Sequence, residues 1–166
     1  PKTVAAVKVD ASHDRRKRAL GAEGEAWAIA ATVNAMLALA TEARAEALLT
    51  ISEFMGKYWA GNAVAAAMAH LPGALEANAD EEDLIADLVG FLHLSEHSDA
   101  FGFDMLGWLD VDESGHPRPV AVEVKSSSTG VFLLSRSEWR WAQHLHDADD
   151  GSGYAVLVVR RGGAAG

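Results

Sequence analysis

The run PVAVEVKSSS, residues 119–128, places valine at every second position over its first half. This two-residue rhythm predicts a β-strand, because successive side chains of a strand point to opposite faces of a sheet. The valines then share one face, and Glu123 and Lys125 share the other, roughly 6.5 to 7 Å apart along the strand. The strand therefore presents a carboxylate and an ammonium group to the same space.

The run before it, FGFDMLGWLD at 101–110, alternates in the same way, and the intervening VDESGHPR is rich in turn residues. We expect the two runs to form a β-hairpin. In the first strand Asp104 stands between Phe103 and Met105. An isolated ionised carboxylate is costly in such an apolar setting, so Asp104 should have a partner.

The expected hairpin predicts a metal site. Its strands lie about 4.8 Å apart, so Asp104 and Glu123 can bring carboxylate oxygens to one hard cation. The carbonyl of Val124 supplies a third oxygen. We therefore expect Mg²⁺ or Mn²⁺ at this place. Hydrolysis of a phosphodiester needs such an ion and a group that positions the attacking water, a role open to Lys125.

The segment from Leu20 to Glu46 is rich in helix formers. Apolar residues recur at helical spacing along one stripe of it: Ala22, Ile29, Val33, Met36 and Ala40. Glu25 lies on the same stripe, because the eleven residues that separate it from Met36 are close to three helical turns. A carboxylate on the core-facing side of a helix suggests a catalytic or metal-orienting role, or a buried cap or ion pair.

Further elements are expected on both sides of the hairpin. Helices are predicted at about 47–68 and 80–94, a short strand at 132–134, and a helix that Ser135 or Ser137 caps and that ends near Asp147. Glu138 should face inward on that last helix. The apolar run YAVLVV, residues 154–159, is typical of a strand covered on both faces.

These residues resemble the PD-(D/E)XK nuclease superfamily, and within it the domain at the C-terminus of the plant protein No Vein and of many bacterial defence and restriction proteins. The matching features are G-x-x-G-E at 21–25, the glycine-led approach to Asp104, E-V-K at 123–125 and L-S-x-x-E at 134–138. Phe103 replaces the proline that the family has before its aspartate. The resemblance covers about 20–44 and 99–161, roughly half the chain.

The resemblance implies an α/β fold with a restriction-endonuclease-like core: a helix, a small mixed β-sheet with a hairpin, a second helix and a final strand. It implies a metal-dependent endonuclease acting on DNA, with Asp104, Glu123, Lys125 and Glu25 as catalytic residues and Glu138 in support. Restriction or anti-phage defence is the implied setting. The alternative is a non-catalytic module of the same fold that binds nucleic acid or a protein partner within a larger assembly.

The length of 166 residues indicates one domain at 20–161, after an N-terminal extension at 1–19 and before a flexible tail at 162–166. A helical insertion is expected at about 45–98. The chain begins at Pro1 and ends in GGAAG, from which we expect a piece of a longer protein whose other domains are partners. A homodimer would suit the cutting of both DNA strands.

The net charge of −10 opposes binding to a polyanion, but the acidity is local. Between Tyr58 and Pro117 there are 12 acidic residues and no Lys or Arg, whereas the remainder holds 12 acids against 14 bases. Cysteine is absent, which excludes thiolate metal sites and thiol nucleophiles. With neither a signal peptide nor a 20-residue apolar run, we expect a cytoplasmic protein with no membrane partner.

Other motifs carry weaker signals. The basic run Arg15 to Arg18 is interpreted as a solvated turn or a phosphate contact, and the pairs His93/His97 and His144/His146 as surface or packing residues. Trp139 and Trp141 are expected as core and rim residues of the last helix rather than as base-stacking platforms. No glycine-rich nucleotide-binding motif is present.

Overall fold

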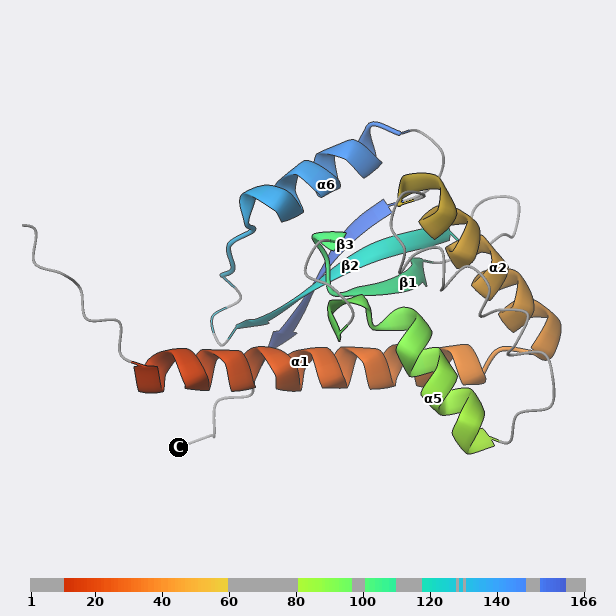
Figure 1. Ribbon diagram of the computed structural model, residues 1–166, viewed down its shortest axis with the longest axis horizontal. Helices are drawn as coiled ribbons and strands as arrows, with labels where there is room; N and C mark the ends of the chain where they lie inside the picture. The colour runs from red at the N-terminus through yellow and green to blue at the C-terminus, as the bar shows by residue number, and fades with distance from the viewer. Residues whose placement is uncertain are drawn as a thin grey trace, which may run out of the picture.

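Strand β2 (Arg118–Ser127) is the centre of a three-stranded sheet in a computed structural model that describes residues 11–59, 81–96, 101–109, 118–127, 129, 131–148 and 153–160 (Figure 1). Strand β1 (Met105–Leu109) pairs antiparallel with β2, and β3 (Gly153–Arg160) pairs with it in parallel. The predicted pairing of the hairpin strands is therefore confirmed. The chain has a mixed α/β fold.

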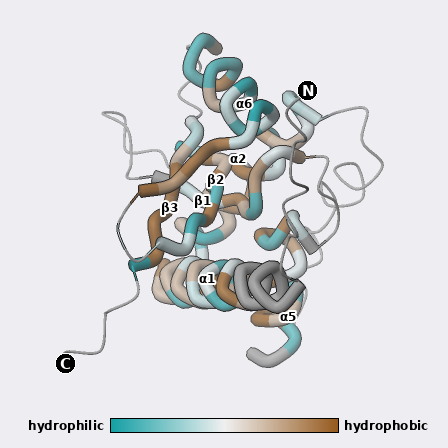
Figure 2. The backbone as a smooth tube through the Cα atoms, turned by 90° about the vertical axis from the view of Figure 1, so that its left-hand side faces the viewer, coloured by the Kyte–Doolittle hydropathy of each residue, from teal (hydrophilic) through white to brown (hydrophobic). Residues whose placement is uncertain are grey.

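Two helices lie on opposite faces of this sheet. Helix α1 (Ala11–Leu37) runs across one face and α6 (Arg136–His146) lies over the other, so that the strands are enclosed between them (Figures 1 and 2). The strands are largely hydrophobic and α6 is largely hydrophilic, as Figure 2 shows. The layered arrangement gives β2 two different environments, one on each face.

Helices α2 (Thr41–Tyr58) and α5 (Glu81–Leu92) complete the core, and a short 3₁₀ turn (Leu94–Glu96) follows α5. Both helices contribute residues that are almost fully buried: Ala47, Leu48, Ile51, Phe54, Met55, Leu88, Phe91 and Leu92. They lie within the predicted insertion at about 45–98, so the parts of that segment that the structure describes pack into the main core. None of the helices in the described ranges combines the length and the apolar composition needed to cross a bilayer.

The prediction of one helix from Leu20 to Glu46 was wrong. Helix α1 starts at Ala11, inside the predicted extension, and ends at Leu37, and α2 begins at Thr41. Ala40 has an extended conformation (φ −58°, ψ 152°) although the local sequence favours a helix. Tertiary packing of α2 against the strands outweighs this local preference. The third helix lies close to its predicted position, and residues 60–68 of the second lie outside the described residues.

The buried stripe of α1 was predicted correctly at Ile29, Val33 and Met36. Ala22 and Ala40 are exposed, and Gly24 and Ala28 are buried in their place. At the start of the described stripe the buried side of α1 is the one that meets β2, at Gly24.

Three strand predictions were also wrong. Residues 101–104, predicted at the start of the first strand and including Asp104, precede β1. Residues 131–135 form no strand, because this segment leads directly into the cap of α6 at Ser135. Strand β3 is half-buried up to Val159 rather than fully buried: α1 and α6 both contact it, but within the described residues it pairs with β2 alone and forms an edge of the sheet. An apolar run therefore did not separate a central strand from an edge strand.

Helix α1 lies very close to β2 at Gly24. A Cβ atom at this position would overlap with the Oγ atom of Ser126 and would lie 3.6 Å from the Ser126 Cβ atom. The Ser126 hydroxyl donates to the carbonyl of Leu20 at 3.0 Å, which ties the strand to the helix. Glycine is thus required by the short distance between the two elements.

We expect Gly24→Ala to lower the free energy of unfolding by about 1–3 kcal/mol, because the new methyl group displaces the Ser126 hydroxyl. The added Ser126→Ala substitution should remove most of that loss, since the remaining 3.6 Å contact is ordinary. Gly56→Ala is the control. Gly56 lies in α2 with open space around it, so alanine should raise stability by about 0.5–1 kcal/mol. Denaturant unfolding measures all of these, and equal effects at Gly24 and Gly56 would contradict the close packing.

Candidate functional site

Asp104 is fixed against β2 one residue before β1 begins. Its Oδ2 atom accepts the backbone N–H of Val124 at 2.7 Å, and its own N–H donates to the carbonyl of Val122 at 3.0 Å. The register pairs Met105 with Val122, so one further step places Asp104 opposite Glu123. The Asp104 carboxylate accepts a β2 N–H that a carbonyl of the neighbouring strand would otherwise accept. This bond holds the carboxylate at the end of the β1–β2 ladder.

Glu123 and Lys125 lie side by side on the face of β2 that is turned away from α1. The Nζ atom of Lys125 is 2.5 Å from Oε1 of Glu123 and 3.1 Å from Oε2 of Glu138. Glu123 is 5% exposed, so its carboxylate is largely removed from water. The predicted shared face of Glu123 and Lys125 is confirmed, and Lys125 joins the strand to α6.

Glu138 holds this position because it belongs to the cap of α6. Its Oε2 atom accepts the Ser135 N–H at 2.8 Å, and its own N–H donates to the Ser135 hydroxyl at 3.3 Å. This reciprocal pair is a capping box, and it identifies Ser135, not Ser137, as the capping residue. The same carboxylate oxygen thus caps the N-terminus of α6 and binds the lysine, and Glu138 faces inward as predicted.

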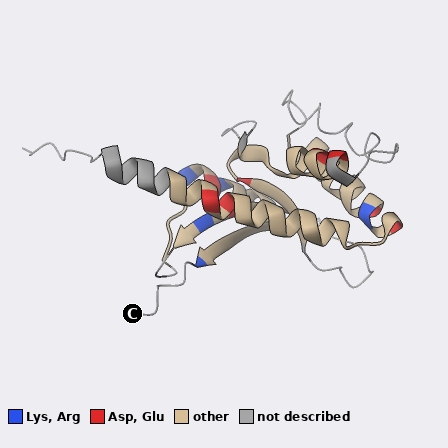
Figure 3. Ribbon diagram, turned by 90° about the horizontal axis from the view of Figure 1, so that it is seen from below, with Lys and Arg blue, Asp and Glu red and all other residues tan. Residues whose placement is uncertain are grey.

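Glu25 of α1 is connected to the cluster by a residue of the 3₁₀ turn. Its Oε2 atom accepts the Ser95 hydroxyl at 3.0 Å and lies 3.4 Å from Nε2 of His93. The backbone N–H of Ser95 donates to the carbonyl of Asp104 at 3.0 Å, so one serine contacts both acidic residues. Figure 3 shows the acidic positions of α1 close to the strand ends that carry basic residues.

The charges of the cluster influence one another. Burial raises the pKa of Asp104 to about 6, although the Val124 N–H lowers it, and the charge of Glu25 raises it further. Burial raises the pKa of Glu123 to about 7 against the hydrogen bond from Lys125, and the charge of Asp104 adds to the rise. Burial also opposes the charged form of Lys125, but its contacts with Glu123 and Glu138 raise its pKa above the ordinary value. The residues therefore form one electrostatic unit.

For Glu138 the balance is reversed. Burial favours its neutral form, but the hydrogen bond from the Ser135 backbone and the contact with Lys125 lower its pKa below the ordinary value. One of the carboxylates is thus held in its charged form by the helix cap.

The residues that sequence analysis selected for a metal ion form an oxygen-only donor set. Asp104 uses Oδ2 and Glu123 uses Oε1 in the bonds above, and no hydrogen bond is made by Oδ1 of Asp104 or Oε2 of Glu123 within the described part of the chain. Oxygen donors suit Mg²⁺ and Mn²⁺. In the same ranges no group of three or more His, Cys, Asp or Glu side chains is arranged to hold a metal ion, so any such ion would need main-chain, water or substrate oxygens as well.

Three neighbours of the cluster were not singled out from the sequence as part of it: Ser95, His93 and Tyr154. The Tyr154 hydroxyl donates to the Gly102 carbonyl at 3.3 Å, and burial together with the charges of Glu123, Glu138 and Asp104 raises the Tyr154 pKa. Gly102 has φ 75°, and a Cβ atom there would overlap with Trp141. Tyr154 and Trp141 thereby hold the turn that leads to Asp104. The one available signal for Tyr154 was the alternation of side chains along β3, where Tyr154 pairs with Ala121 of β2.

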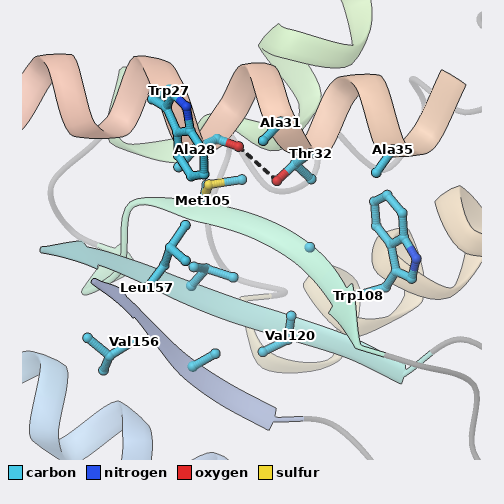
Figure 4. Close-up of a pocket in the computed structure, with 13 residues that line it drawn as sticks. Trp27, Ala28, Ala31, Thr32, Ala35, Met105, Trp108, Val120, Val156 and Leu157 are labelled. Atoms are coloured by element: carbon cyan, nitrogen blue, oxygen red, sulfur yellow. Dashed lines mark hydrogen bonds between the residues drawn. The ribbon is translucent and has the colours of Figure 1, made fainter. Parts of the chain in front are cut away.

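An apolar cavity of about 380 Å³ lies on the other face of the sheet, beneath α1 (Figure 4). Its lining includes Trp27, Ala28, Ala31, Met105, Val120 and Leu157. Its threonine, Thr32, donates its hydroxyl to the Ala28 carbonyl at 2.9 Å. No charged side chain is among its lining residues, whereas Glu123 and Lys125 lie on the opposite face of β2.

Searches of family models, of curated proteins and of solved structures find no match to this chain. The arguments for function therefore depend on the residues and their geometry.

We expect Glu123→Gln to raise stability at pH 8 more than at pH 4. The folded state binds a proton on Glu123 up to about pH 7, whereas the unfolded chain releases it near 4.5. The folded state is therefore favoured at low pH and loses this advantage as the pH rises through 7. Glutamine cannot ionise, so the gain at pH 8 should be about 1 kcal/mol after allowance for solvent screening.

Thermal unfolding in EDTA at both pH values measures this difference. Glu53→Gln, an exposed carboxylate on α2, is the control and should leave the pH dependence as in the wild type. A Glu123→Gln protein that is less stable than the wild type at pH 8 would mean that the ion pair with Lys125 outweighs the burial of Glu123.

Proposed function

We propose that this chain is a metal-dependent nuclease domain that hydrolyses DNA phosphodiester bonds, with Asp104, Glu123 and the Val124 carbonyl as ligands of Mg²⁺ or Mn²⁺. The observation that supports it is the cluster itself. Two carboxylates lie beside a lysine at the end of the β1–β2 ladder, and one oxygen of each accepts no hydrogen bond from a described residue. An ordinary ion pair between Glu123 and Lys125 would not require a second carboxylate, that of Asp104, at the end of β1. The resemblance to the PD-(D/E)XK superfamily and its restriction-endonuclease-like core is part of the same proposal.

The order of elements supports this reading. A helix with an inward glutamate, two antiparallel strands, a capped helix and a parallel strand occur in the order that this core has, with α2, α5 and the 3₁₀ turn between the first helix and the strands. Residues of two of the matching motifs have structural roles that suit this reading: Gly24 lets α1 approach β2, and Ser135 and Glu138 form the cap beside Lys125. A role in restriction or anti-phage defence belongs to the proposal through this resemblance.

Each residue has a role that follows from its contacts. The metal, when bound, would polarise the phosphate and lower the pKa of an attacking water. Lys125, held between Glu123 and Glu138, would orient that water and offset the negative charge that develops on phosphate. Glu25 lies close enough to Asp104 for its charge to raise the Asp104 pKa, and it would support Asp104 in holding the metal.

We expect Asp104→Asn and Lys125→Ala to separate metal binding from chemistry. Asp104→Asn should weaken Mn²⁺ binding at least about tenfold and abolish cleavage, because it removes a charged ligand. Lys125→Ala should retain Mn²⁺ binding and lower the cleavage rate by about 100-fold or more, because it removes only the positioning cation. Calorimetry measures the first effect, and cleavage of a labelled DNA mixture of single strands and duplexes measures the second.

Circular dichroism checks the fold of each variant, and Glu53→Gln should behave as the wild type in both assays. EDTA should stop cleavage and added Mg²⁺ should restore it. Cleavage that survives in Asp104→Asn would contradict the assignment. DNA binding by the wild type without metal-dependent cleavage would instead favour the non-catalytic module.

A further inference from the structure

The outer face of α6 carries an exposed stripe of cationic and aromatic residues. Trp139, Arg140 and Gln143 lie three, four and seven residues after Arg136, so the four residues share one side of the helix. All four are exposed, and Trp139 has 55% of its surface accessible. The inward side of the same helix carries Glu138, Trp141 and the buried Leu145. We call the four outward residues the α6 stripe.

The α6 stripe has no counter-charge of its own. Neither Arg136 nor Arg140 forms an ion pair with any described residue. Its nearest carboxylate in sequence, Glu138, is turned toward Lys125. Two guanidinium groups on either side of an exposed indole are therefore available to an external anion.

The stripe borders the carboxylate–lysine cluster. Trp139 follows Glu138, whose Oε2 atom is 3.1 Å from the Lys125 Nζ atom. The segment that leads into the helix also exposes apolar side chains: Val131, Phe132 and Leu133, with Leu133 86% exposed. It is anchored to the end of β2, because the Ser127 hydroxyl donates to the Val131 carbonyl at 2.9 Å. The aromatic and cationic groups of the stripe therefore lie next to the proposed site.

We propose that the α6 stripe binds unpaired nucleotides, with Trp139 stacked on a base and Arg136 and Arg140 on the flanking phosphates. This inference rests on the proposed nuclease function and names single-stranded nucleic acid as the substrate class. An exposed ring can stack only on a base that is not already stacked within a duplex. Arginine next to the ring supplies phosphate contacts along the same strand.

Trp27, the second exposed tryptophan among the described residues, shows that the charges around an exposed ring determine which kind of partner it suits. Trp27 is 59% exposed, but it lies on α1 beside alanines and borders the apolar cavity. No basic residue occurs in α1 between Ala19 and Leu37. A surface of that kind suits an apolar partner, whereas the α6 stripe combines the ring with two cations. Trp27 is consequently a matched control for Trp139.

The test is the binding of a fluorescent thymidine oligonucleotide of about 15 nucleotides to the whole chain in EDTA, compared with a hairpin duplex. The wild type should bind the single strand more tightly. Trp139→Ala should weaken that binding roughly tenfold and Trp139→Phe should keep most of it, because phenylalanine retains a stacking face. Trp27→Ala should bind as the wild type. Arg140→Ala should lower the slope of log affinity against log salt by about 1.

The outcomes separate this inference from the nuclease proposal. Asp104→Asn should still bind the oligonucleotide, so a loss of cleavage with binding intact concerns only the metal site. Equal affinity of Trp139→Ala and the wild type overturns the inference, as does equal loss in both tryptophan variants. Sedimentation that shows a wild-type dimer and a Trp139→Ala monomer, without any change in oligonucleotide affinity, also overturns it by assigning the stripe to a second copy of the chain.

Discussion

The alternation of side chains along β2 is the constraint on which the other parts of the structure depend. Its valines face α1 and close the apolar side of the sheet, which leaves Glu123 and Lys125 no position except the side of α6. A slip of one residue would bury the lysine under α1 and expose the valines. The register with β1 and β3 therefore fixes both the packing and the polar cluster, and neither can change alone.

The cluster is held together by groups that each satisfy two demands. The Asp104 carboxylate accepts the Val124 N–H of β2 through one oxygen, and its other oxygen has no hydrogen-bond partner among the described residues. Ser95 uses its N–H for Asp104 and its hydroxyl for Glu25. Buried carboxylates are tolerated where hydrogen bonds and a cation compensate them, but the raised pKa values of Asp104 and Glu123 show that the compensation is partial. Strain of this electrostatic kind is typical of functional sites and also of some structural ion-pair networks.

The sequence was informative where a periodic pattern acts within one element. Alternation placed Glu123 and Lys125 on one face, and helical spacing turned Glu25 and Glu138 inward. It failed where contacts between distant elements decide. The break between α1 and α2 lies in a run of good helix formers, and β3 has the apolar run of a central strand but is an edge of the sheet among the described residues. Ser95 and Tyr154 belong to no motif, so only the folded chain shows that they contact Glu25 and the Gly102 turn.

Glu138 links the fold to both proposals. As the third residue of α6 it completes the capping box, which fixes where the helix starts and how it is rotated. That rotation directs Glu138 to Lys125, and because successive helical residues are about 100° apart it turns Trp139 outward beside the cluster. A helix that started one residue later would move the carboxylate away from the lysine and the indole away from the edge of the site. The spacing between Ser135, Glu138 and Trp139 therefore couples the stability of one helix end to the position of the cation and of the exposed ring.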